Sequence, residues 1–360
     1  MTMKEMILDD LKTIKKYDGS DMMSLIESFS DQCEKAAGIG NAFELPVSLK
    51  ADHKNIVFTG LGGSAIGADI IRSYLADEVT VPILVNRNYA LPKFVDNLSL
   101  VVVSSYSGNT EETLSAYKDA KAKKAKIVAI TSGGELERLA KTDGFPVLKI
   151  PGGLPPRCAL GYSFFPALIL LSKIGLIKDQ TAYIDETIKT IRGLKDKELG
   201  HDVPSGKNRA KDIAGSLYQK YPIIYSGQDH FDCAATRWRG QLAENSKTLS
   251  STHVLPEMNH NEIVGWENPK GLLKDFVVII LRDAGDPARI ARRMDIIKNI
   301  ISGRKVRVIE VNSSGNALLT RIFSLIYTGD LVSFYLAILN QCDPTPVKSI
   351  VYLKEELGKR

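Results

Sequence analysis

The sequence predicts an α/β protein made of two tandem, doubly wound parallel sheets, each flanked by helices. Short runs of Val, Ile and Leu alternate with longer segments of helical periodicity, and this alternation is typical of βα units. The alternation occurs twice along the chain, with an irregular segment between the two series. The length of 360 residues also favours two domains, because one compact core usually takes fewer residues.

Residues 1–45 are predicted to form a helical N-terminal arm that packs on the rest of the protein. Apolar side chains recur there at helical spacing, and they are Ile7, Leu11, Ile14, Met22, Leu25, Ile26 and Phe29.

Residues 46–200 are predicted to form the first sheet domain. Its strands are expected at Lys54–Gly60, Val79–Val85, Leu100–Ser104, Ala125–Thr131 and Phe145–Ile150. The Gly- and Pro-rich segment 151–162 interrupts the pattern, and two covering helices are expected after it, at Ser163–Ile174 and Asp185–Leu199.

Residues 207–342 are predicted to form the second sheet domain, and residues 343–360 a loop and helix that contribute to the active site. Strands are expected at Pro222–Ser226, Phe276–Leu281 and Val306–Val311. Helices are expected at Phe231–Lys247, Asp286–Ser302, Ala317–Asn340 and Ile350–Leu357. This second series resembles the first, although direct identity is slight.

Composition and charge narrow the classes of function. The net charge of +5 suits an anionic substrate but is too diffuse to indicate a nucleic-acid partner. Four cysteines lie far apart without metal or redox spacing, which favours reduced thiols in a cytoplasmic protein. No apolar run approaches the roughly 18 residues that would span a membrane, so no membrane partner is expected.

The strongest signal of a binding site follows the Val-rich strand Leu100–Ser104. Ser105, Ser107 and Thr110 offer hydroxyl groups around Gly108, immediately before a helical segment. Backbone N–H groups at the start of a helix, helped by short hydroxyl side chains, bind phosphate well. The alternative is an ordinary helix N-cap, which accounts for one or two of these hydroxyls.

A second glycine-rich turn, Gly60-Leu-Gly-Gly-Ser-Ala65, follows the first predicted strand. It matches the loose dinucleotide fingerprint, but the second predicted strand ends in Asn86-Arg87-Asn88, without the expected acidic residue. Arg87 could instead suit a phosphorylated ribose, so an oxidoreductase stays open as the weaker alternative. Ser64 lies at the carboxyl end of a neighbouring strand, so a single monophosphate site explains both turns together.

These residues carry a family resemblance. The segment Ser-Tyr-Ser-Gly-Asn-Thr-Glu-Glu, residues 105–112, resembles the sugar-phosphate signature of the sugar isomerase domain family. The segment RWRGQLAENSK, residues 237–247, is similar to one in the bifunctional phosphoglucose/phosphomannose isomerases of that superfamily, and so is Pro-Glu-Met-Asn-His-Asn-Glu, residues 256–262. The resemblance implies two sugar isomerase domains.

The resemblance also implies roles for residues that the pattern alone would leave as surface charges. Glu244 becomes the proton-transferring base, and His260 opens the sugar ring from the neighbouring subunit of a homodimer. Arg157 and Lys348 become active-site cations. Gly63 is placed among the substrate-binding residues, and Gln341 near C2 of the sugar.

The implied activity is the interconversion of glucose 6-phosphate and mannose 6-phosphate with fructose 6-phosphate through a cis-enediol. One carboxylate can remove and return the proton, so neither a metal nor a redox cofactor is required. A metal site of His253, Glu257 and His260 ranks low, because loop spacing is unspecific. A sugar-phosphate-binding regulator without turnover, or an isomerase of another sugar phosphate, stays open as an alternative.

Overall fold

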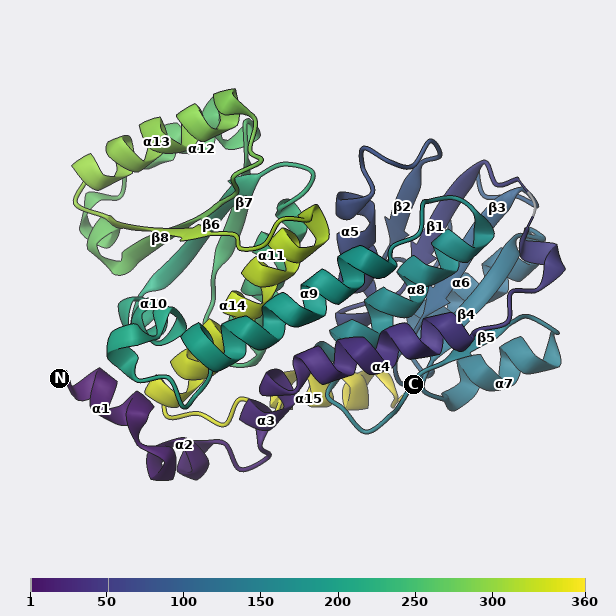
Figure 1. The fold of residues 1–360 in the computed structure, drawn as a ribbon, viewed down its shortest axis with the longest axis horizontal. Coiled ribbons are helices and arrows are strands. Elements are labelled where there is room, and N and C mark those ends of the chain that lie inside the picture. The colour runs from purple at the N-terminus through teal and green to yellow at the C-terminus, as the bar shows by residue number, and fades with distance from the viewer. Residues whose placement is uncertain (1, 51, 360) are drawn as a thin grey trace. The chain divides into compact units, whose positions relative to one another are not determined.

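The computed structural model describes residues 2–50 and 52–359 and contains two parallel sheets (Figure 1). The chain divides into two compact units. The first-sheet unit comprises Ser28–Thr190 and Gly315–Ile322, and the second-sheet unit comprises Met1–Glu27, Ile191–Ser314 and Phe323–Arg360. Both units confirm the α/β fold class.

The first sheet has five parallel strands in the order β2-β1-β3-β4-β5. Their bounds are β1 Asn55–Thr59, β2 Ile83–Asn86, β3 Ser99–Ser104, β4 Lys126–Thr131 and β5 Val147–Lys149. Every residue of the central strand β3 is buried, as expected for a parallel strand covered on both faces. All five predicted strands are confirmed, although β2 begins four residues later than expected.

Helices cover the first sheet and connect its strands. They are α4 Phe29–Ala42, α5 Gly63–Tyr74, α6 Glu111–Ala122, α7 Gly134–Thr142, α8 Leu160–Ile174 and α9 Thr181–Leu194. The apolar helix α8 packs against α4 and α5. Between β3, β4 and the helices α6 and α7 lies a core of buried aliphatic side chains with Tyr117.

The second sheet has four parallel strands in the order β7-β6-β8-β9. Their bounds are β6 Tyr221–Gly227, β7 Ser251–Leu255, β8 Phe276–Arg282 and β9 Arg307–Asn312. Three of these strands were predicted, whereas β7 was not. β7 lies at the edge of the sheet and four of its five residues are only half-buried, so it lacks the apolar pattern of the other strands.

The second-sheet unit also contains helices. They are α1 Met3–Asp9, α2 Leu11–Tyr17, α3 Met22–Glu27, α10 Arg209–Leu217, α11 Asp232–Glu244, α12 Glu262–Gly265, α13 Ala288–Gly303, α14 Leu318–Leu339 and α15 Lys348–Leu357. Helix α14 contributes to this unit from Phe323 onward. The terminal helix was predicted to begin at Ile350 and begins two residues earlier, at Lys348. The side chains of α15 are exposed.

Helix α14 corrects the expectation that no apolar run approaches the length of a membrane span. Its 22 residues are long and apolar enough, by length and composition, to cross a membrane. The whole of its most apolar window is nevertheless buried inside the protein. That burial accounts for the composition, because a central helix with protein on every side needs apolar residues all round.

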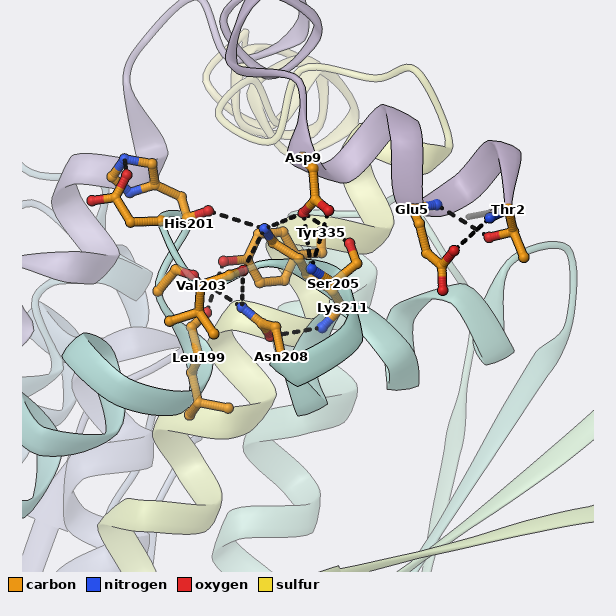
Figure 2. Close-up of polar contacts among 12 residues, drawn as sticks. Thr2, Glu5, Asp9, Leu199, His201, Val203, Ser205, Asn208, Lys211 and Tyr335 are labelled. Atoms are coloured by element: carbon orange, nitrogen blue, oxygen red, sulfur yellow. Dashed lines mark hydrogen bonds and ion pairs between the residues drawn. The ribbon is translucent and has the colours of Figure 1, made fainter.

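A buried lysine anchors the N-terminal helix α1 within the second-sheet unit (Figure 2). The side chain of Lys211 on α10 is 1% exposed, and its Nζ donates to Asp9 Oδ1 at 2.8 Å. The same Nζ donates to the carbonyl oxygens of His201 at 3.0 Å and Val203 at 2.9 Å. These three acceptors match the three donors of an ammonium group, which satisfies the buried charge.

The helical periodicity of the N-terminal arm is confirmed in part. Ile14 and Met22 are buried as predicted, but Leu11 is 43% exposed and Leu8 is buried in its place. The reason is a break between α1 and α2, where the Asp10 side chain accepts hydrogen bonds from the N–H groups of Lys12 and Thr13. A new helix therefore begins there, and the periodicity restarts.

Candidate active site

Neighbouring strands β1 and β3 carry the predicted phosphate-binding residues at their carboxyl ends. Ser64 lies in the first turn of α5, and Ser105, Ser107 and Thr110 lie in the loop between β3 and α6. Ser64 Oγ accepts a hydrogen bond from the Tyr106 N–H at 3.0 Å. The structure therefore brings together the two turns that the sequence singled out.

The cradle hydroxyls are oriented by the backbone of their own loop. Ser105 Oγ accepts from the Gly108 N–H at 3.1 Å, and Ser107 Oγ accepts from the Asn109 N–H at 3.3 Å. A hydroxyl that accepts from an N–H keeps its own proton to donate elsewhere. Ser64 and Ser107 share this arrangement, which suits an anionic ligand, whereas the Ser105 hydroxyl donates to Thr110 Oγ1 at 3.1 Å.

Thr110 distinguishes the phosphate hypothesis from the N-cap alternative. It occupies the N-cap position of α6, yet its side chain makes no capping hydrogen bond. Its hydroxyl instead lies 3.1 Å from Ser105 Oγ. The Thr110 hydroxyl thus contacts Ser105 and does not cap α6.

Two glycines allow the close approach that shapes this site. Gly108 has a φ of +73°, and a Cβ there would lie 1.8 Å from the carbonyl oxygen of Gly133. A Cβ on Gly63 would lie 2.3 Å from the carbonyl oxygen of Pro156, in the residue before Arg157. Only glycine fits either position without moving the backbone.

Arg157 is not the surface charge that an isolated arginine usually is. It lies in a 3₁₀ turn, Pro156–Cys158, and is 4% exposed. The tight contact of Gly63 with Pro156 places this turn against the start of α5. A buried guanidinium beside an anion-binding turn fits the active-site role that the resemblance implies.

Tyr106 links the cradle to the segment that carries Arg157. Its hydroxyl oxygen accepts from the Leu154 N–H at 2.9 Å, and its carbonyl oxygen accepts from Ser132 Oγ at 2.6 Å. The tyrosine is 8% exposed. The sequence pattern indicates no role for Tyr106, although this residue lies within residues 105–112, the segment that resembles the sugar-phosphate signature.

The second-sheet unit carries Glu244, which is the last residue of α11 and half-buried. Two buried side chains earlier in α11 fix this helix within the unit. Arg237 forms a buried ion pair with Asp330, with nitrogen–oxygen distances of 3.0 and 2.7 Å. Trp238 is fully buried on the other face and donates from Nε1 to the Leu325 carbonyl at 2.7 Å.

Glu244 and Lys348 line the same pocket, whose volume is about 610 Å³. Lys348 is exposed and is the first residue of α15. Lys247 lines this pocket too, together with apolar side chains that include Leu249, Val347 and Ile350. A carboxylate and two ammonium groups in one pocket provide an acid–base set.

Two other predicted residues of this unit lie outside the residues that line the pocket. Gln341 is exposed, has a φ of +53°, and directly precedes the pocket residue Cys342. His260 is exposed at the end of a 3₁₀ turn, Glu257–His260, in the segment after β7. Among the described residues, no group of three or more His, Cys, Asp or Glu side chains is placed to hold a metal ion.

The carboxyl edge of the second sheet differs chemically from that of the first. Asp283 and Asp286 follow β8, and their carboxylates accept hydrogen bonds from the N–H groups of Gly285 at 2.7 Å and Asp283 at 2.9 Å. Asp283 also contacts the Ser313 hydroxyl. This loop therefore carries carboxylates where the corresponding loop of the first sheet carries hydroxyl groups.

Comparisons with known proteins match both halves of the chain. A SIS domain model matches residues 51–142, and the model of the bacterial phospho-glucose isomerase C-terminal SIS domain matches residues 206–357. A bifunctional phosphoglucose/phosphomannose isomerase of Caldicellulosiruptor bescii is 49% identical over 339 residues, covering 94% of this chain and 99% of that protein. The chain belongs to this family. A member from Aquifex aeolicus is 38% identical, covering 89% of this chain and 97% of its own length.

The fold agrees with the family assignment. A crystal structure of a hypothetical protein from Thermus thermophilus superposes with a TM-score of 0.72, at 15% identity, over 97% of this chain and 92% of its own. At that identity the superposition supports the fold alone. It agrees with the SIS-type fold that the family models assign to both halves of this bifunctional isomerase family member.

Proposed function

We propose that this protein interconverts glucose 6-phosphate and mannose 6-phosphate with fructose 6-phosphate. The observation that carries the proposal is the 49% identity, across 94% of the chain, to a protein named for both activities. The pocket that contains Glu244 and Lys348 supports it, because aldose–ketose isomerisation is proton-transfer chemistry.

Glu244 is the proposed base. It removes the proton from C2 of the aldose phosphate, which leaves a cis-enediol, and returns a proton to C1 of the ketose. Its position in one pocket with Lys247 and Lys348 supports this role, because a base needs proton-donating groups within reach of the same substrate. Arg157 stabilises the negative charge that develops on the enediolate oxygens.

The phosphate group is assigned to the cradle of Ser64, Ser105, Ser107 and Thr110, with Gly63 providing close backbone approach. Binding energy from this remote group orients the reacting carbons without taking part in proton transfer. The hydrogen bonds that orient the Ser64 and Ser107 hydroxyls support this assignment. Gln341 is assigned to the surroundings of the C2 hydroxyl.

His260 is proposed to open the sugar ring, assisted by Lys348, by moving a proton between the ring oxygen and the C1 hydroxyl. We assign His260 to the pocket of a second copy of the chain in a homodimer. Its exposure, and its position outside the residues that line the pocket of its own chain, support this donation.

The proposed chemistry moves only protons, so we expect turnover without an added metal or redox cofactor. We also propose that the protein works in the cytoplasm. The cysteines Cys33, Cys158, Cys233 and Cys342 support that assignment, because none of them is in a disulfide and secreted proteins tend to oxidise their thiols.

A coupled assay of purified, chelator-treated protein with fructose 6-phosphate tests the proposed function. We expect both glucose 6-phosphate and mannose 6-phosphate as products, scored separately. One product alone would narrow the substrate range. Tight binding of fructose 6-phosphate without any product would contradict the enzyme and favour a sugar-phosphate sensor.

A further inference from the structure

The two short segments that carry Glu244 and Lys348 meet at a third residue, Lys247. Lys247 lies three residues after Glu244, beyond the end of α11, and it lines the same pocket. Its Nζ donates to the Glu244 carbonyl oxygen at 2.5 Å and to the Pro344 carbonyl oxygen at 3.1 Å. One ammonium group therefore joins the end of the base helix to the loop that precedes Lys348.

The backbone at Lys247 ends α11 in an ordinary way. Its φ of +57° is the left-handed conformation that often follows a helix C-terminus, as it also does at Lys305 after α13. The evidence for a particular role is therefore the pair of side-chain contacts, which place the ammonium group against both Glu244 and Pro344.

Other contacts hold the start of the same loop, where Cys342 Sγ lies 3.7 Å from the Ser246 carbonyl oxygen. Asn340 Nδ2 donates to the Ser246 carbonyl oxygen at 2.9 Å, which holds the start of the loop. Asp343 accepts from the Thr345 N–H at 2.9 Å, which shapes the loop but does not attach it to α11. The contact with Pro344 holds the loop midway between Gln341 and Lys348.

We propose that Lys247 is a positioning residue for the isomerisation, setting the separation between the Glu244 carboxylate and the Lys348 ammonium group. This inference rests on the proposed function, since it matters only if both groups act on one sugar. Lys247 acts through the Glu244 and Pro344 backbones, so its loss lowers the rate of proton transfer. Substrate affinity, which the phosphate cradle supplies from the other unit, is retained.

The test compares K247M, K247R and a matched control, K305M. Lys305 also follows a helix of the second-sheet unit, is exposed, and has a left-handed φ of +63°, but it does not line the pocket. Measurements are kcat and KM with fructose 6-phosphate, the Kd for fructose 6-phosphate by calorimetry, and the midpoint of thermal unfolding.

We expect K247M to lower kcat about 30-fold, as small misplacements of catalytic groups do, while the Kd changes less than about two-fold. K247R, which retains donors on a stem of similar length, should recover most of the rate. K305M should match the wild type. If K247M does not yield folded protein, K247Q is measured in its place.

A wild-type kcat in K247M would overturn the assignment while leaving the proposed function intact. So would equal losses of rate and affinity, or a loss that K247R does not rescue, since either would indicate a general structural defect. Absence of turnover in the wild-type protein would instead overturn the proposed function, and the role of Lys247 with it.

Discussion

At the carboxyl edge of the first sheet, the loops after β1 and β3 present hydroxyl groups whose lone pairs are occupied by backbone N–H groups. At the same edge of the second sheet, the loop after β8 presents Asp283 and Asp286, whose carboxylates bind the N–H groups of their own turn. The strand–turn–helix topology is the same, and the loop residues decide what each edge can bind.

The comparison extends to where the reacting groups lie. In the first-sheet unit, the proposed phosphate site lies at the edge that parallel sheets ordinarily use for ligands. In the second-sheet unit, Glu244 lies at the far end of α11 and Lys348 at the start of α15. We therefore expect the first-sheet unit to contribute phosphate affinity and the second-sheet unit to contribute proton transfer.

The largest expected effect is on turnover in the second-sheet unit. E244Q keeps the shape of the side chain but removes the base, so kcat should fall about 1,000-fold or more while the Kd for fructose 6-phosphate stays unchanged. Steady-state kinetics and calorimetry measure the two quantities. E267Q, which alters an exposed carboxylate paired with Arg304 at 3.6 Å, should leave both unchanged.

The next largest effect is on stability, and it concerns Arg237, which lies on the same helix, α11, as Glu244. R237M leaves the Asp330 carboxylate buried without its guanidinium partner, and loss of one member of such a pair costs about 3–5 kcal/mol. Urea denaturation should show this loss in the free energy of unfolding. R138M, which removes an exposed ion pair with Glu135 in the first-sheet unit, should produce no measurable change. Equal losses of unfolding free energy in R237M and R138M would contradict a stabilising role for the buried Arg237–Asp330 ion pair.

A smaller effect is expected at the phosphate cradle. S107A removes an exposed hydroxyl and should raise KM for fructose 6-phosphate about ten-fold, since hydrogen bonds to charged groups are stronger than neutral ones. kcat should change less than KM. D283S alters the corresponding edge of the second sheet and should leave KM within about two-fold of the wild type. If D283S raised KM and S107A did not, phosphate binding would have to be assigned to the second-sheet unit.

The smallest effect concerns the anchor of α1 and its dependence on pH. Burial opposes ionisation of Asp9, but hydrogen bonds from Lys211 and Ser205 outweigh it and lower the pKa of Asp9 below its ordinary value. A lowered carboxyl pKa contributes stability above the pKa of the unfolded chain, and this contribution is lost as the pH falls through the folded value.

D9N should therefore reduce the free energy of unfolding at neutral pH by about 1 kcal/mol, because Lys211 keeps its charge and its two carbonyl partners but loses its anionic partner. The difference from the wild type should shrink below about pH 4. Denaturation across this range measures it. D212N, which changes an exposed carboxylate next to Lys211, is the control; a constant D9N deficit at every pH would contradict the account.

Much of the fold could be predicted from hydrophobic periodicity, and the exceptions have physical causes. The buried strand β3 has an apolar run that only a central parallel strand requires, and it was predicted closely. The edge strand β7 was missed because its half-buried residues carry no such pattern. Leu11 was misplaced because Asp10 starts a new helix and shifts the period.

The candidate site could be predicted where residues adjacent in sequence also act together. Ser105, Ser107 and Thr110 share one loop, so their spacing was informative. Lys247 and Tyr106 act through contacts with distant segments, at Pro344 and Leu154, which spacing does not reveal. The roles of Glu244, His260 and Arg157 came from family resemblance, because an isolated charged residue has no pattern of its own.

The most direct test of the division between the two units follows the C1 protons of fructose 6-phosphate by NMR in D₂O. Wild-type protein should exchange one of these protons for deuterium, S107A should do so at saturating substrate, and E244Q should bind the sugar without exchange. That result would assign proton transfer to the second-sheet unit. Continued exchange in E244Q at the wild-type rate would contradict the account.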